Sequence, residues 1–163
     1  MDNLVIFCAK YLVFVVPLIV FWVWLKQSKK GRLELVLAIA ISGLIALILV
    51  KIAGKLYSNP RPFIVEHAQP LVSHGNDNGF PSEHTVFAMT LTAVIYFYHR
   101  QLAVIALAIT LLVGIGRVVA DVHHGVDIVG GLVIGAIAGA AGYYIAKQLA
   151  PKLGESPKTE TEK

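Results

Sequence analysis

Residues 116–127 read GRVVADVHHGVD, a polar stretch between two long apolar runs. It holds Arg117, an imidazole six residues later at His123, and a carboxylate four residues after that at Asp127. If the chain turns helical near residue 122, His123 and Asp127 lie one turn apart on one helix face, where the carboxylate can accept the ring N–H and fix the tautomer. The other ring nitrogen is then free to attack an electrophile, and Arg117 can hold an anion.

Two upstream patches have the same character. They read KLYSNPRP at residues 55–62 and PSEH at residues 81–84. Together the three patches resemble the signature of the type-2 phosphatidic acid phosphatase family of membrane lipid phosphatases, which is Lys with Arg-Pro, then Pro-Ser-Gly-His, then Ser-Arg with His and Asp. The match covers roughly residues 55–127, and its third part keeps the spacing of the arginine, histidine and aspartate.

The resemblance implies a role for eight residues. His123 would be the nucleophile that forms a phosphohistidine, Asp127 would orient it, and His84 would be the general acid for the leaving group and then the base for water. The phosphate would be held by Lys55, Arg61, Ser82, Glu83 and Arg117. Side-chain chemistry agrees, because imidazole both attacks and exchanges protons near neutral pH, and a guanidinium pairs two phosphate oxygens at once.

This scheme requires no metal and no cofactor. A zinc site formed by His123, His124 and Asp127 is the alternative, although adjacent histidines on a helix point about 100° apart.

Three positions depart from the family pattern. Glu83 stands where glycine is usual, and Gly116 replaces the serine before Arg117. Only five residues separate Lys55 from Arg61, so that Gly54 occupies the position expected for the lysine and Lys51 is a spare candidate.

Composition predicts a membrane protein. The chain has 163 residues, of which 56% are hydrophobic and 15% charged, with a mean hydropathy of +0.71. Soluble domains carry about a quarter charged residues. The net charge of +4 indicates no nucleic-acid partner, because the cations gather at the ends of apolar runs. The single Cys8 excludes a disulfide within one chain.

The apolar runs predict an all-α integral membrane bundle of about five transmembrane helices. We expect a retained first helix that Pro17 kinks, a long loop at 57–80 that is either functional or disordered, and a phosphatase domain at 1–149 followed by a polar, disordered cytoplasmic tail at 150–163. The five expected helices are 4–25, 33–54, 82–98, 102–119 and 123–147.

Gly131, Gly135 and Gly139 recur every four residues and predict a face for close helix contact. This face is either a packing seam within the chain or the contact of a homodimer.

The cations at 26–32 predict a cytoplasmic loop and therefore a catalytic end on the outer face of the membrane, which the family resemblance implies is a bacterial inner membrane. An outward site in a short chain resembles the undecaprenyl diphosphate phosphatases that recycle the carrier lipid of the cell wall. Phosphatidylglycerophosphate or phosphatidic acid is the alternative lipid substrate. A small proton-coupled transporter is the alternative from another functional class, since ionisable groups at membrane depth often mark ion paths.

Overall fold

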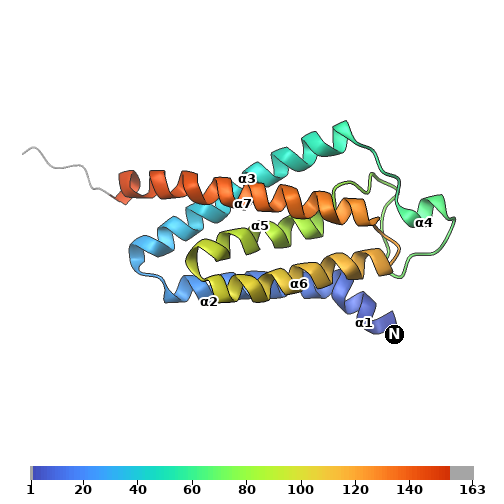
Figure 1. Ribbon diagram of the computed structural model, residues 1–163, viewed down its shortest axis with the longest axis horizontal. Helices are drawn as coiled ribbons and strands as arrows, with labels where there is room; N and C mark the ends of the chain where they lie inside the picture. Colours follow the sequence, from blue (N-terminus) through green and yellow to red (C-terminus); the bar gives the residue numbers. More distant parts are fainter. Residues whose placement is uncertain (1, 155–163) are drawn as a thin grey trace, which may run out of the picture.

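A computed structural model describes residues 2–154 and shows a bundle of long helices (Figure 1). Four segments are long and apolar enough to cross a membrane: Asp2–Lys26, Lys29–Leu56, Arg100–Val119 and Gly125–Pro151. A fifth helix, α5 (Glu83–Tyr98), has 16 residues and lies among the others. The predicted all-α membrane bundle is confirmed. The count of five crossings stays a prediction, because α5 is shorter than the roughly 20 residues that a crossing needs.

The first segment changes helix type along its length. It comprises α1 (Asp2–Ile6), a π-helix η1 (Phe7–Tyr11), a 3-10 turn η2 (Leu12–Phe14) and α2 (Val15–Lys26). A proline lacks the amide N–H, and its ring crowds the carbonyl four residues earlier. The expected disturbance at Pro17 therefore takes the form of irregular turns just before it.

Side chains mark where two other helices begin. Ser28 Oγ accepts the Gly31 N–H (3.2 Å) at the start of α3 (Lys29–Leu56), and His99 Nδ1 accepts the Leu102 N–H (3.3 Å) at the start of α6 (Arg100–Val119). Unpaired amides of a first helical turn favour such acceptors.

The last helix, α7 (Gly125–Gly154), begins later and ends later than the sequence predicts. Its final residues belong to the stretch from residue 150 that we expected to be a disordered tail, so the predicted boundary at 149 falls inside a helix. The rest of that tail, 155–163, lies outside the described residues.

The glycine face of α7 packs against α5. A Cβ atom at Gly135 would lie 2.7 Å from the Val86 carbonyl oxygen, and one at Gly139 would lie 2.6 Å from the Thr90 carbonyl oxygen. Real Cβ atoms do not approach so closely, so only glycine permits this helix spacing. The glycine face is thus a packing seam between α7 and α5 within the chain.

The largest buried cluster lies mainly on α2, α3, α5 and α6, with Val13 of η2 and Ala146 of α7, and it includes Val16, Leu35 and Ile95. It holds the helices together along their length. The polar residues of the three sequence patches lie at one end of the bundle instead.

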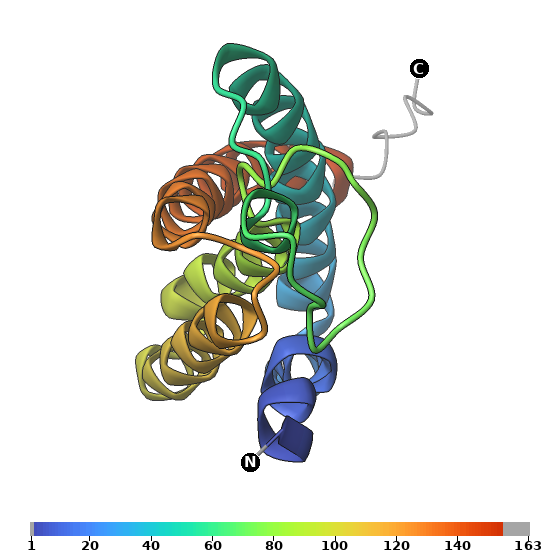
Figure 2. The same ribbon diagram turned by 90° about the vertical axis from the view of Figure 1, so that its right-hand side faces the viewer.

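The segment between α3 and α5, with the short helix α4 (Pro62–Val65), crosses that end (Figure 2). The turn at 120–124 between α6 and α7 lies at the same end.

Asn78 fixes this segment. Its Nδ2 donates to the carbonyl oxygens of Gly54 (2.9 Å) and Tyr57 (3.1 Å), and its Oδ1 accepts the N–H groups of Asn59 (2.8 Å) and Phe80 (3.0 Å). One amide thereby ties the end of α3 to both ends of the loop.

Candidate active site

A cavity of about 80 Å³ lies beneath the loop, at the ends of α5 and α6. It is small beside ligand pockets of about 300–1,000 Å³, so it suits a headgroup and not a lipid tail. The charged and imidazole side chains that line it are Arg61, His74, Asp77, Glu83, His84, Arg117 and His123.

The tautomer of His123 follows from its neighbours. Its Nε2 lies 3.2 Å from Arg61 Nη1 and 3.4 Å from Arg117 Nη2. A guanidinium can only donate, so Nε2 accepts and carries the lone pair. Nδ1 then bears the proton and donates to Asp127 Oδ2 at 3.4 Å. The nitrogen suited to attack therefore faces the two groups suited to hold a phosphate.

Burial lowers the pKa of His123; the hydrogen bond with Asp127 opposes this shift, and the charges of Arg117 and Arg61 reinforce it. His123 is therefore unprotonated near neutral pH, as a nucleophile must be.

Asp127 is fully buried and accepts three hydrogen bonds. Besides His123, its donors are Asn59 Nδ2 (2.8 Å, to Oδ1) and the His124 N–H (2.8 Å, to Oδ2). The second of these bonds reaches back from the third residue of α7 to the residue before the helix, as an acidic side chain does in a capping box.

The expected helix start near residue 122 is wrong, because α7 begins at Gly125 and leaves His123 in the preceding turn. His123 and Asp127 are in contact because the Asp127 side chain, in the first turn of α7, points toward the residues that precede the helix.

The two arginines are held differently. Arg61 Nε donates to Asp77 Oδ1 and its Nη1 donates to the Val122 carbonyl, both at 2.8 Å. This bond to Arg61 lowers the pKa of Asp77. Arg117 Nη1 donates to the Ala9 carbonyl oxygen at 3.4 Å, whereas its buried Nε has no hydrogen-bond partner among the described residues. A buried donor without an acceptor is costly, and Arg117 Nη2, 3.4 Å from His123 Nε2, is the nitrogen of this side chain suited to hold a phosphate oxygen.

The start of α5 also lines the cavity, through Glu83 and His84. The first amides of a helix have no partner within it and favour an anion.

Ser82 holds the expected N-cap position but does not line the cavity. Its N–H donates to the Asp127 carbonyl oxygen (3.1 Å), and its buried hydroxyl accepts a hydrogen bond from Thr85 (3.1 Å). In this structure Ser82 joins α5 to α7, and the geometry does not support the expected contact with phosphate.

Lys55 is exposed on the last turn of α3 and does not line the cavity, and Lys51 is exposed one turn earlier. The geometry therefore gives no support to the phosphate-binding role that the resemblance implies for Lys55.

His124 does not line the cavity either; its Nδ1 lies 3.1 Å from Asn59 Nδ2. Within residues 2–154, no group of three or more His, Cys, Asp or Glu side chains is arranged to hold a metal ion.

Sequence reasoning missed Asn59, which lies within the first patch, and His74 and Asp77, which lie in the loop between the first two patches. It also missed Gly79, where a Cβ would lie 2.9 Å from the Asn59 carbonyl oxygen and 3.1 Å from Asp127 Oδ2. The one available signal was the concentration of glycine, asparagine and aspartate in a loop flanked by two motifs.

The structure explains one departure from the family pattern. A Cβ at Gly116 would lie 2.9 Å from both the Ala9 nitrogen and the Cys8 Cβ. The π-helix η1 thus packs directly on α6 beside Arg117, and a serine at 116 would force the two helices apart.

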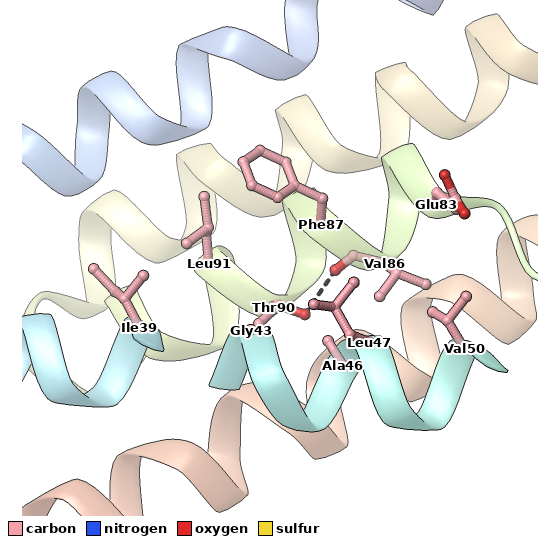
Figure 3. Close-up of a pocket in the computed structure, with 10 residues that line it drawn as sticks. All are labelled: Ile39, Gly43, Ala46, Leu47, Val50, Glu83, Val86, Phe87, Thr90 and Leu91. Atoms are coloured by element: carbon pink, nitrogen blue, oxygen red, sulfur yellow. Dashed lines mark hydrogen bonds between the residues drawn. The ribbon is translucent and has the colours of Figure 1, made fainter. Parts of the chain in front are cut away.

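An apolar groove of about 350 Å³ adjoins the cavity between α3 and α5 (Figure 3). Its walls include Gly43, Leu47, Phe87 and Leu91, and Glu83 lies at one end of it (Figure 3). Val50 and Glu83 line both spaces, so the groove leads directly to the polar cavity.

Comparison with known proteins agrees with this geometry. The family model described as the PAP2 superfamily matches residues 31–150. A protein of Bacillus licheniformis named bacitracin transport permease protein BcrC is 31% identical over 150 residues, which cover 91% of this chain and 73% of the relative. The undecaprenyl-diphosphatase BcrC of Bacillus subtilis (strain 168) is 28% identical over 151 residues, 93% of this chain and 78% of the relative.

A solved structure is also similar. The crystal structure of Aquifex aeolicus LpxE matches with a TM-score of 0.64 and 26% identity, over 87% of this chain and 82% of that chain.

Proposed function

Because the chain belongs to the PAP2 superfamily and is a membrane phosphatase of that kind, we propose that it removes the terminal phosphate of undecaprenyl diphosphate through a phosphohistidine on His123. The observation that carries the proposal is the position of His123 Nε2, 3.2 Å and 3.4 Å from the guanidinium nitrogens of Arg61 and Arg117. The diphosphatase name of the Bacillus subtilis relative supports the choice of substrate.

The first step transfers the phosphoryl group. With the terminal phosphate held by Arg61 and Arg117, the Nε2 lone pair of His123 forms a bond to phosphorus. The bond from phosphorus to the bridging oxygen breaks, and its electron pair stays on that oxygen. His84 lines the same cavity; once the bound phosphate pairs with Arg117, His84 takes up a proton from bulk water in each turnover and would donate it to the departing lipid monophosphate. Asp127 stabilises the positive charge that develops on the imidazole of His123.

The groove between α3 and α5 supports a lipid substrate. The groove meets the cavity at Val50 and Glu83, and along it an isoprenoid chain would lie against the side chains of Leu47 and Phe87. Apolar area removed from water contributes roughly 25 cal/mol per Å² to such binding.

A bulky side chain placed in the groove should therefore reduce activity on substrates with a long isoprenoid chain more than on substrates with a short one. A Cβ at Gly43 meets nothing within 4 Å, so Gly43→Phe places a ring in the groove without a backbone clash. We expect kcat/KM for undecaprenyl diphosphate to fall on the order of 10- to 200-fold, the scale of a misfit in a hydrophobic pocket. A short-chain prenyl diphosphate and the Gly43→Ala control should change little. Equal losses on long and short substrates would show that the chain does not occupy this groove.

Transport is not favoured by the placement of charge. No Asp, Glu, Lys or Arg lies between His84 and Tyr98, between Arg100 and Gly116, or between Ile128 and Ala146. An ion path through α5, α6 and α7 would therefore lack ionisable groups at mid-depth.

A substrate panel tests the proposed function. Phosphate release from undecaprenyl diphosphate, phosphatidylglycerophosphate and phosphatidic acid should be measured on the detergent-solubilised protein in EDTA. We expect the diphosphate to have the highest kcat/KM and EDTA to have no effect, because arginines and a helix N-terminus neutralise the charge. A preference for phosphatidylglycerophosphate or phosphatidic acid would show that the proposed substrate is wrong, and it would leave the proposed phosphohistidine mechanism unchanged. Dependence on added Mg²⁺ or Zn²⁺ would contradict the mechanism.

The proposal includes an outward-facing site in a bacterial inner membrane. The turn at 27–28 and the start of α6 lie at the end of the bundle opposite the cavity (Figure 1), and Lys26, Lys30, Arg32 and Arg100 gather there. Cytoplasmic loops carry such an excess of cations.

Cysteine labelling tests this orientation. In a Cys8→Ala background, Gly75→Cys places a thiol on the exposed loop, where a Cβ meets nothing within 4 Å. An impermeant maleimide should label it in intact cells and should label Lys30→Cys only after lysis. The reverse pattern would place the catalytic end in the cytoplasm.

A further inference from the structure

His74 is a third histidine in the cavity, and neither the sequence motifs nor the mechanism above uses it. It lies in the loop between α4 and α5, and its ring stands edge-on to that of His123, with centroids 6.1 Å apart at 76°. His74 therefore lies beside the nucleophile in the same cavity.

Asp77 orients His74. The Nδ1 of His74 lies 3.7 Å from Asp77 Oδ1, the same oxygen that accepts the Arg61 Nε–H at 2.8 Å. A proton on Nδ1 faces this carboxylate, and Nε2 is left with its lone pair. One aspartate therefore accepts a hydrogen bond from a phosphate-binding arginine and lies within ion-pair distance of an imidazole.

His84 lacks such a partner. No ion pair or hydrogen bond joins its ring to a carboxylate in the described part of the chain. A base that becomes an imidazolium needs a nearby anion, and among the cavity histidines besides His123, His74 has one.

We propose that His74, oriented by Asp77, is the general base that activates the water for hydrolysis of the phosphohistidine. This rests on the proposed function, and it moves the second role that the resemblance implies for His84 onto a residue outside the family motifs. His84 keeps the first role, as the acid for the leaving lipid phosphate.

Hydrolysis transfers the phosphoryl group from His123 to water. The water oxygen forms a bond to phosphorus while the bond from phosphorus to His123 Nε2 breaks, and that electron pair returns to Nε2. The water proton passes to His74 Nε2, and Asp77 stabilises the imidazolium. The His74 side chain is 25% exposed, so the proton then leaves to bulk water and inorganic phosphate departs.

The protonation state of His74 is compatible with this role. Burial lowers its pKa to about 4, and the charges of Arg61 and Arg117 contribute to the shift. His74 is thus unprotonated at neutral pH in the free protein. A bound phosphoryl group pairs those two arginines, which weakens their effect and makes His74 a stronger base when it is needed.

Rapid-quench kinetics test the proposal with the matched pair His74→Asn and His67→Asn. His67 is an exposed histidine of the same loop that does not line the cavity, and asparagine tolerates its positive φ of 52°. With undecaprenyl diphosphate labelled in the terminal phosphate, His74→Asn should form the phosphoenzyme in a burst and discharge it roughly 10²–10⁴-fold more slowly. His67→Asn should behave as the unaltered protein does.

A second readout separates a missing base from damaged folding. Hydroxylamine attacks without a base, so it should accelerate discharge of the phosphoenzyme of His74→Asn. Unchanged turnover in His74→Asn, or loss of turnover without phosphoenzyme, would overturn the proposal. If the unaltered protein and His67→Asn also release no phosphate, the proposed function itself fails.

Discussion

His123→Ala is expected to reduce phosphate release to background and to leave no covalent phosphoenzyme. His123 Nε2 is the only imidazole nitrogen within 3.5 Å of donors from both Arg61 and Arg117 in the described part of the chain. His74 and His84 line the same cavity but make no such contact, so neither is placed to replace it. The loss should be on the order of 10⁶-fold, the scale that removal of a nucleophile has in other covalent enzymes.

His124→Ala is the matched control for this variant. The His124 ring contacts Asn59 outside the cavity, and its N–H, which binds Asp127, survives the substitution. Most activity should remain. Turnover by His123→Ala together with an inactive His124→Ala would reverse the assignment of the nucleophile.

Asp127→Asn should give the second-largest loss, about 10⁴-fold in kcat by analogy with the same change in the serine-protease triad. An amide keeps the size of the carboxylate but offers one acceptor oxygen where three donors converge. If the new amide NH₂ group faces His123 Nδ1, that nitrogen must accept a hydrogen bond, so the imidazole proton moves to Nε2. Nε2 then becomes a donor that faces the donors of two guanidinium groups. The attacking lone pair is lost even though the fold is retained.

A pair of measurements separates this effect from unfolding. Asp127→Asn should keep its thermal unfolding midpoint within a few degrees and bind a product such as inorganic phosphate, because Arg61 and Arg117 are intact. A variant that retains more than about a tenth of the wild-type kcat would show that Asp127 does not control the tautomer.

Hydrophobic runs and helix caps are sufficient to predict the membrane bundle and the meeting of the three motifs at one end. Two loops separated by two antiparallel helices must share an end, so the order of the runs along the chain already predicts that Arg61, His84, Arg117 and His123 gather there. These residues line the cavity as expected.

The loop could not be predicted, because bonds between residues distant in sequence decide its path. The amide of Asn78 selects the carbonyls of Gly54 and Tyr57, and Gly79 lets the backbone approach Asp127. These contacts bring His74 into the cavity, and no local pattern indicates them.

Lys55 is a residue for which the sequence predicted a place in the site and the structure shows none. Its nearness to Arg61 in sequence suggested a shared role, but α3 continues through Leu56 and leaves the lysine on an exposed face. The direction of a side chain at a helix end depends on where the helix stops, and sequence patterns locate that point only within a few residues.

The most direct test of the account is to locate the phosphoryl group on the protein. The wild-type protein should be mixed for milliseconds with undecaprenyl diphosphate labelled in the terminal phosphate, denatured in alkali, digested and sequenced by mass spectrometry. We predict an alkali-stable, acid-labile label on His123. A label on Ser82, His84 or His74, or steady turnover with no labelled residue at all, would contradict the central claim.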